Sequence, residues 1–194
     1  MYPVSDAFLR AIRSNTRKYF WTGAIVTKGG MTYEFGAKEI VKGSGYISRQ
    51  CCGSTEIELG TVYAAEMGIT LLSDIDRYTL EDAQVTLVFH LVLADDSVED
   101  VPMGVFEVSE ANCLAKCLEL KAYDFMLRFD KSFNGFETVG TAYDFIALCC
   151  KRCKVEFANK RAEIDAMPNG GVTLSVYTEN DIETCRDVLF YVAQ

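Results

Sequence analysis

Apolar and polar residues alternate along several short stretches in the first two thirds of the chain. A period of two predicts β-strands with one buried face. Residues 20–26 are aromatic and β-branched, and Gly29-Gly30 predicts a hairpin that returns through residues 31–35. The alternation recurs at Ile57 and Leu59, between Glu56 and Glu58, and resumes beyond Gly60 at Met67, Ile69 and Leu71. A glycine inside such a run predicts a bulge or a bend.

A second strand of the same kind follows at residues 85–93, where Val85, Leu87, Phe89, Leu91 and Leu93 share one face. Asp95-Asp96-Ser97 predicts a turn, after which residues 98–108 pair back. Pro102 predicts that this returning segment is an edge strand or carries a bulge. Residues 114–122 fit a further strand or a helix equally well.

Helical spacing of apolar residues dominates the two ends of the chain. Residues 4–14 predict a short helix that Ser5 or Asp6 caps. Residues 139–153 carry a longer apolar stripe. A final helix is expected with Asn180 as its N-cap and Glu183 three residues on, and it meets no stop signal before Gln194. We therefore expect that the chain was cut from a longer one.

These patterns predict an α+β protein with two parts. Residues 1–112 form a β-rich platform with a short N-terminal helix, and residues 113–194 form an α+β part that is rich in helices. With 194 residues, 49% of them hydrophobic, and three prolines, the chain has the apolar content that a packed core requires.

Charge and hydropathy narrow the range of partners. The net charge of −9 repels phosphate backbones, and the densest basic cluster, Lys151-Arg152-Cys153-Lys154 with Lys160 and Arg161 nearby, fits the negative pole of a helix C-terminus. We expect no specific nucleic-acid binding. No stretch is apolar for the roughly 20 residues that a membrane span needs, and the N-terminus lacks the pattern of a signal peptide. Synthesis and folding in a cytosol are expected.

The eight cysteines are the unusual feature of the composition. In a cytosol reduced thiols are the default, and free cysteine commonly packs as a small hydrophobic residue. The alternative is a zinc site built from Cys150-x-x-Cys153 and a second pair, which would make the chain a cysteine- or zinc-dependent regulatory or binding protein. No second C-x-x-C exists, and His90 is the single histidine. We assign no metal-binding residues.

Catalytic motifs are absent from the sequence. There is no phosphate-binding loop, no H-E-x-x-H and no complete dinucleotide fingerprint, and Asp74-x-Asp76 fails the spacing of a calcium loop. A cysteine–histidine pair would have to use His90, which we expect to be a surface or hydrogen-bonded residue. The paired carboxylates, Glu56/Glu58, Asp95/Asp96 and Glu99/Asp100, leave a hydrolase as a further alternative. We expect no enzyme, no catalytic residues and no cofactor.

The order of several short segments resembles the N-terminal region of bacteriophage tail-tip proteins, the baseplate hub or tail-associated structural proteins of long-tailed phages and prophages. The segments that carry the resemblance are Tyr2-Pro3-Val4-Ser5-Asp6-Ala7-Phe8, Ile57-Glu58-Leu59-Gly60 through Glu66, Val101-Pro102-Met103-Gly104-Val105-Phe106-Glu107-Val108, Lys121-Ala122-Tyr123-Asp124, the Tyr143 helix with Cys150-x-x-Cys153, and Thr184-Cys185-Arg186-Asp187-Val188-Leu189. Cys185 stands where the family usually has an aromatic residue.

The resemblance implies a structural protein with barrel-like strand layers and a helical insertion. It also implies assembly into a ring, commonly a trimer, together with other phage tail proteins. Such a protein is made in the bacterial cytoplasm and resides in the virion tail once assembled. In this family, regions further along the chain can carry a hydrolase or a receptor-binding part.

Overall fold

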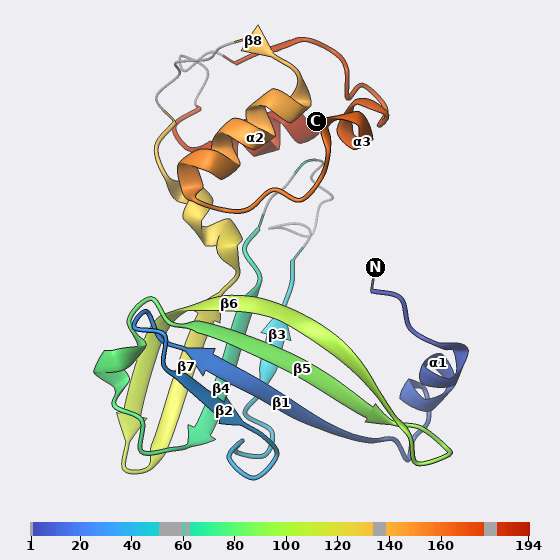
Figure 1. Cartoon of the computed structure of the whole chain (residues 1–194), viewed down its shortest axis with the longest axis vertical. Coiled ribbons are helices and arrows are strands. Elements are labelled where there is room, and N and C mark those ends of the chain that lie inside the picture. Colours follow the sequence, from blue (N-terminus) through green and yellow to red (C-terminus); the bar gives the residue numbers. More distant parts are fainter. Residues whose placement is uncertain (1, 51–59, 61–62, 134–138, 177–181) are drawn as a thin grey trace. The chain divides into compact units, whose positions relative to one another are not determined.

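The computed structural model describes residues 2–50, 60, 63–133, 139–176 and 182–194 (Figure 1). The chain divides into two compact units. The first comprises Met1–Ser48 and Ala65–Asp124, and the second comprises Arg49–Ala64 and Phe125–Gln194. The alternating stretch predicted at residues 56–59 lies outside the described residues. The helices that the structure describes include none that is long and apolar enough to cross a membrane.

The first unit is built on one antiparallel sheet of seven strands in the order β2-β1-β5-β6-β7-β4-β3. The strands are β1 (Lys18–Val26), β2 (Thr32–Phe35), β3 (Tyr46–Ser48), β4 (Glu66–Leu72), β5 (Gln84–Val92), β6 (Val98–Leu114) and β7 (Cys117–Tyr123). The α+β class and the hairpin at Gly29-Gly30 are confirmed. The barrel-like arrangement is corrected: the sheet stays open, because no described pairing joins its short end strands, β2 and β3.

The longest strand, β6, is bent by two irregularities. The pairing with β5 shifts register between Leu87 and Val88, which face Gly104 and Pro102, so Met103 is an extra residue. A second shift lies between Val108 and Glu110. Such bulges increase the local bend and twist of a strand. They allow β6 to pair with β5 along its first half and with β7 along its second half, and they confirm the bulge predicted from Pro102.

The segment that fitted either a strand or a helix is the strand β7, which pairs with both β6 and β4. Its alternate residues Leu118, Leu120 and Ala122 are buried in the core of the sheet. The border expected after residue 112 falls inside β6, and residues 113–124 belong to the first unit.

The core of the first unit lies on one face of the sheet because period-two alternation directs the apolar side chains to the same side. Its fully buried members include Ile25, Met67, Leu71, Val85, Phe106, Leu118 and Leu120. Helix α1 (Asp6–Ile12) is capped by Ser5, whose hydroxyl accepts the Phe8 N–H at 3.0 Å, as predicted. The ring of Phe8 packs edge-on against Phe89 of β5 with ring centres 6.4 Å apart.

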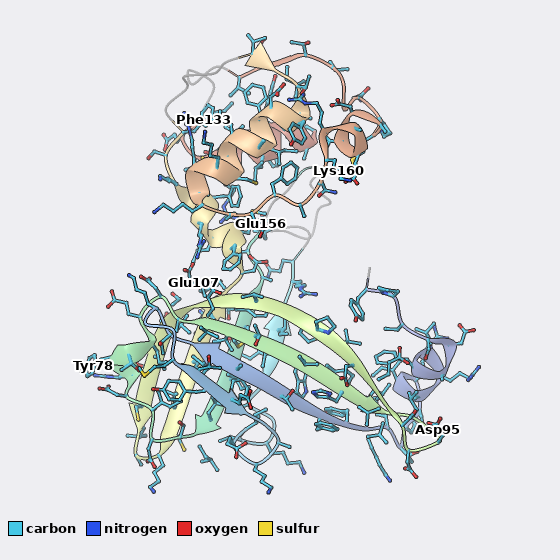
Figure 2. The ribbon with its side chains drawn as sticks, viewed as in Figure 1. Tyr78, Asp95, Glu107, Phe133, Glu156 and Lys160 are labelled. Carbon is cyan, nitrogen blue, oxygen red and sulfur yellow. The ribbon has the colours of Figure 1, made fainter. Side chains whose placement is uncertain are left out.

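The second unit is helical around its own core. It contains the 3-10 helix η2 (Phe125–Asp130), α2 (Ala142–Cys153), α3 (Arg161–Asp165), α4 (Cys185–Ala193) and the short pair β8 (Val139–Gly140) and β9 (Leu174–Ser175). This confirms the helix-rich final third. The core includes Phe129, Phe133, Phe145, Val176 and Val188 together with four cysteines. Figure 2 shows Phe133 inside this unit.

The helices of the second unit begin with matched capping boxes. Thr141 caps α2 and pairs reciprocally with Asp144, and Thr184 caps α4 and pairs reciprocally with Asp187. The N-cap predicted at Asn180 is therefore wrong, and Asn180 itself lies outside the described residues. A T-x-x-D box competed with the Asn180 signal and prevailed, because it satisfies the amide N–H groups of the first turn from both sides.

Candidate functional site

Four of the cysteines described in the second unit form a buried cluster. Cys149, Cys150 and Cys153 lie on α2 and Cys185 opens α4, and all four are buried. Burial is the main cause that raises the pKa of the Cys153 thiol to about 12, and the neighbouring Cys185 is the second cause. The same two causes raise the pKa of Cys149. Protonated thiols are poor nucleophiles and poor metal ligands. Among the described residues, no group of three or more His, Cys, Asp and Glu side chains is arranged to hold a metal ion.

His90 lies at the centre of a cross-strand hydrogen-bond chain. Its Nε2 is 2.7 Å from Thr22 Oγ1 on β1, and its Nδ1 is 2.6 Å from Asp100 Oδ1 on β6. The ring of Phe20 stacks on the imidazole with centres 4.5 Å apart, and the His90 side chain is only 14% exposed. The imidazole is thus hydrogen-bonded on both nitrogens, as expected. The order hydroxyl–imidazole–carboxylate is that of a nucleophile relay, which the sequence pattern did not reveal.

Acyl transfer requires more than this relay. An oxyanion needs converging N–H donors beside the nucleophile. Thr22 lies in the interior of β1, where its backbone pairs with Val88 of β5, and the next residue, Gly23, pairs with both Leu87 and Phe35. The hydrogen bonds of His90 to Thr22 and Asp100 tie three neighbouring strands, β1, β5 and β6, together.

The other carboxylates considered from the sequence serve local structure. Glu99 accepts the Ser5 N–H at 2.8 Å and so anchors the start of α1. Asp95, in the β5–β6 turn (Figure 2), accepts from the backbone and the hydroxyl of Ser97, and these bonds hold the pKa of its carboxyl below the usual value. Asp76 caps the 3-10 helix η1 (Arg77–Leu80). Glu56 and Glu58 lie outside the described residues.

The basic residues around the end of α2 also have structural partners. Lys131 Nζ donates to the carbonyl of Arg152, and Arg128 Nη1 donates to that of Lys154, each at 3.1 Å. The guanidinium of Arg152 lies 4.8 Å from the ring centre of Phe133. Cations at a helix C-terminus complement its unpaired carbonyls. The cations that bond these carbonyls are Lys131 and Arg128, which lie outside the basic cluster named from the sequence.

The first unit contains a cleft of about 590 Å³ between β1 and the segment that leads into β3. One wall is formed by residues 17–21, and the other by Lys42, Gly43, Gly45 and Tyr46. Ile40, Ile69 and Leu87 line it from below, and the last two are nearly fully buried in the core. Aromatic rings from Tyr19, Trp21 and Tyr46 and cations from Arg17, Lys18 and Lys42 complete the lining.

One wall of the cleft is fixed by a polar network. Tyr46 Oη donates to Glu66 Oε1 at 2.6 Å, and Lys121 Nζ lies 3.4 Å from Glu66 Oε2. The hydrogen bond from Tyr46, outweighing the opposing effect of desolvation, lowers the pKa of Glu66, and the same bond raises the pKa of Tyr46. Three strands thereby hold the phenol ring in place, since Tyr46, Glu66 and Lys121 lie on β3, β4 and β7.

The sequence pattern did not identify this cleft. A usable signal was present, because the single tryptophan, Trp21, follows the basic pair Arg17-Lys18 at the start of a strand. Lys42 and Tyr46 are brought opposite that pair only by the fold.

No protein-family model matches this sequence, and no curated protein matches it. Among solved structures, a chain from a structure described as the virion of a native gene transfer agent (GTA) particle is similar at 12% sequence identity with a TM-score of 0.40. The match covers 61% of this chain and 44% of that chain, so this chain spans less than half the length of its structural neighbour. A likeness at this level is too distant to assign a fold family or a function.

Proposed function

We propose that this chain is a structural component of a phage or prophage tail tip, in the baseplate hub, and that it is not an enzyme. It assembles with copies of itself, as a trimer, and with other tail proteins. It is made in the bacterial cytoplasm and becomes part of the virion tail.

The observation that carries the proposal is the number of strand edges in the first unit with which no described strand pairs. β2 and β3 are the end strands of the sheet. β2 pairs only with residues 23–26 of β1, which leaves the first part of that edge of β1 without a described partner strand. β7 pairs with β6 only from Glu107 onward, which does the same for the first part of the β6 edge that faces β7. Unpaired edges expose rows of N–H and C=O groups that soluble monomers usually cover. An assembly component provides that cover through its neighbours.

The segments that carry the sequence resemblance support a structural reading. Met103 is the extra residue of the β6 bulge, and Thr184 and Asp187 form the capping box of α4. Arg186 Nε binds Asp130 Oδ1 at 2.5 Å and so ties α4 to η2. These residues build the fold.

Light scattering over a concentration series, combined with native mass spectrometry, tests the assembly. We expect a trimer whose fraction grows with concentration. A protein that stays monomeric at every concentration and in the presence of its neighbouring tail proteins would contradict the proposal.

Location is tested on intact particles. An antibody against the chain should label the tail end of particles induced from a lysogen that encodes it. Label on the capsid, or particles that lack the chain altogether, would refute the tail-tip assignment. Hydrolysis of peptidoglycan by the purified protein would refute only the proposal that the chain is not an enzyme.

A further inference from the structure

One strand edge lies directly beside the cleft. All nine residues of β1 pair with β5, whereas β2 pairs with residues 23–26 only. No described strand pairs with residues 18–22 on the side opposite β5. Residues 18–21 of this open stretch line the cleft.

The backbone groups that face this open side can be identified from the hairpin. Thr27, directly after β1, donates its N–H to the Met31 carbonyl at 2.9 Å. Alternate residues of a strand direct their backbone groups to the same side. Tyr19 and Trp21 therefore direct their N–H and C=O groups to the side that β2 leaves open.

The floor and rim of the cleft fit an extended segment with alternating side chains. Ile40, with the small exposed parts of Ile69 and Leu87, gives the cleft an apolar floor that suits the apolar side chains of such a segment. Arg17, Lys18 and Lys42 line the cleft, and no aspartate or glutamate is among the lining residues. Neither Lys18 nor Lys42 takes part in an ion pair within the described part of the chain.

We propose that the cleft binds an extended, acidic segment of a partner protein, which adds to β1 as a further strand. Its backbone pairs with Tyr19 and Trp21, its apolar side chains cover the floor, and its carboxylates meet the three cations. The inference rests on the proposed assembly function, for which it names a surface and a kind of partner. A small anionic molecule would satisfy the cations but would leave the strand edge unpaired.

The single tryptophan makes the proposal directly measurable, because Trp21 lies in the cleft. The probe is an acetylated and amidated five-residue peptide of alternating glutamate and valine, and the control probe replaces glutamate with lysine. We expect saturable change of the Trp21 emission with the acidic peptide, weakening as salt is raised, and no change with the basic peptide. Hydrogen exchange should slow at the amides of Tyr19 and Trp21.

Two variants at one position separate backbone pairing from side-chain contact. Tyr19→Pro removes the N–H that faces the open edge, and proline is tolerated at such an edge position. Tyr19→Ala removes the ring but keeps the N–H. We expect Tyr19→Pro to bind the acidic peptide about tenfold more weakly than Tyr19→Ala, the effect of one lost hydrogen bond. Circular dichroism establishes that both variants are folded.

The charge of the partner is tested by Lys18→Glu combined with Lys42→Glu, which should shift the preference toward the basic peptide. Equal binding of both peptides to the unaltered chain, or equal binding of the acidic peptide to the two Tyr19 variants, would overturn the proposal. Absence of any peptide binding would also overturn it while leaving the trimer and the tail label intact. If the charge reversal instead abolishes self-association without peptide, the occupant is a second copy and the proposal is wrong.

Discussion

The ring of Tyr46 on β3 lies directly over Gly68 on β4. A Cβ atom on Gly68 would come within 2.7 Å of the ring atom Cζ and 2.9 Å of the phenol oxygen. Tyr46 and Gly68 are also register partners in the sheet. The glycine thus provides the space in which one wall of the cleft is built, and the Tyr46–Glu66 hydrogen bond holds the ring there.

Replacing Gly68 by alanine should displace the ring and break its bond to Glu66. We expect Gly68→Ala to lower the free energy of unfolding by about 1 kcal/mol, since one hydrogen bond and one ring contact are lost. Chemical denaturation measures the effect. Gly45→Ala is the matched control, because a Cβ atom at Gly45 meets nothing within 4 Å. Equal stability of both variants would contradict the close packing of Tyr46.

A second glycine is more tightly enclosed. A Cβ atom on Gly23 would collide with the Phe35 ring and with the Thr86 carbonyl oxygen, which belongs to the backbone of β5 and cannot swing away. We expect Gly23→Ala to destabilise the fold by about 2 kcal/mol through overpacking. Gly29→Ala serves as the control, because the nearest atom to its Cβ is Thr27 Oγ1 at 3.9 Å. A neutral Gly23→Ala, measured by thermal unfolding, would disprove the contact.

The hydrogen-bond chain through His90 is predicted to be structural. Thr22→Val keeps the shape of the side chain but leaves Nε2 of the largely buried imidazole without its partner. We expect a loss of about 1 kcal/mol in the free energy of unfolding. Release of nitrophenol from an activated ester should be the same in both proteins. A rate that falls in Thr22→Val while the fold is retained would identify a nucleophile.

The buried cysteines should resist modification in the native state. Because burial raises the pKa of Cys149, Cys150 and Cys153, few thiolates exist at neutral pH. In a Cys51→Ser/Cys52→Ser background, a disulfide reagent should modify the exposed Cys113 at once and the buried thiols only after denaturant is added. Stoichiometric zinc in elemental analysis, released by a thiol reagent, would instead support the metal-dependent alternative.

The capping box of α2 should make stability depend on pH. The Arg161 guanidinium, followed by the N–H and hydroxyl of Thr141, holds the pKa of Asp144 well below its usual value of about 4. A lowered folded-state pKa stabilises the protein above the unfolded value, and this contribution is lost as the pH falls below about 4. The melting temperature of Asp144→Asn should therefore lie below that of the unaltered chain at pH 7.

The difference in melting temperature between Asp144→Asn and the unaltered chain should shrink toward about pH 2.5. The reason is that the Asp144 carboxyl takes up a proton, on the order of one per molecule, when the chain unfolds at low pH. Glu156→Gln is the matched control, since Glu156 is exposed and no hydrogen bond or ion pair of its side chain is described. A difference that stays constant across this range would contradict the role of the Asp144 charge.

Local patterns predicted most of the described secondary structure. Alternation located β4 and β5, the diglycine located the first hairpin, and Ser5 located the start of α1. Each signal lies within a few residues of the structure that it predicts. The N-cap predicted at Asn180 was wrong because two local signals competed there, and the reciprocal Thr184–Asp187 pair was the stronger.

These patterns could not predict which strands pair with one another in the sheet. Residues 114–122 have the composition of either a helix or a strand, and pairing with β6 on one side and β4 on the other decided for a strand. The Thr22–His90–Asp100 chain joins residues that are 68 and 10 positions apart, and only strand register brings them together. The spacing of these residues in the sequence does not predict such contacts.

The sequence by itself determined an α+β chain whose alternating stretches bury one face of a sheet and whose final third is helical, because side-chain periodicity is a local property of the backbone. Only the tertiary structure decided that the sheet stays open and that Trp21, Lys42 and Tyr46 line one cleft. Closure and clefts depend on which strands meet at the ends of a sheet, and that is set by the packing of segments far apart along the chain.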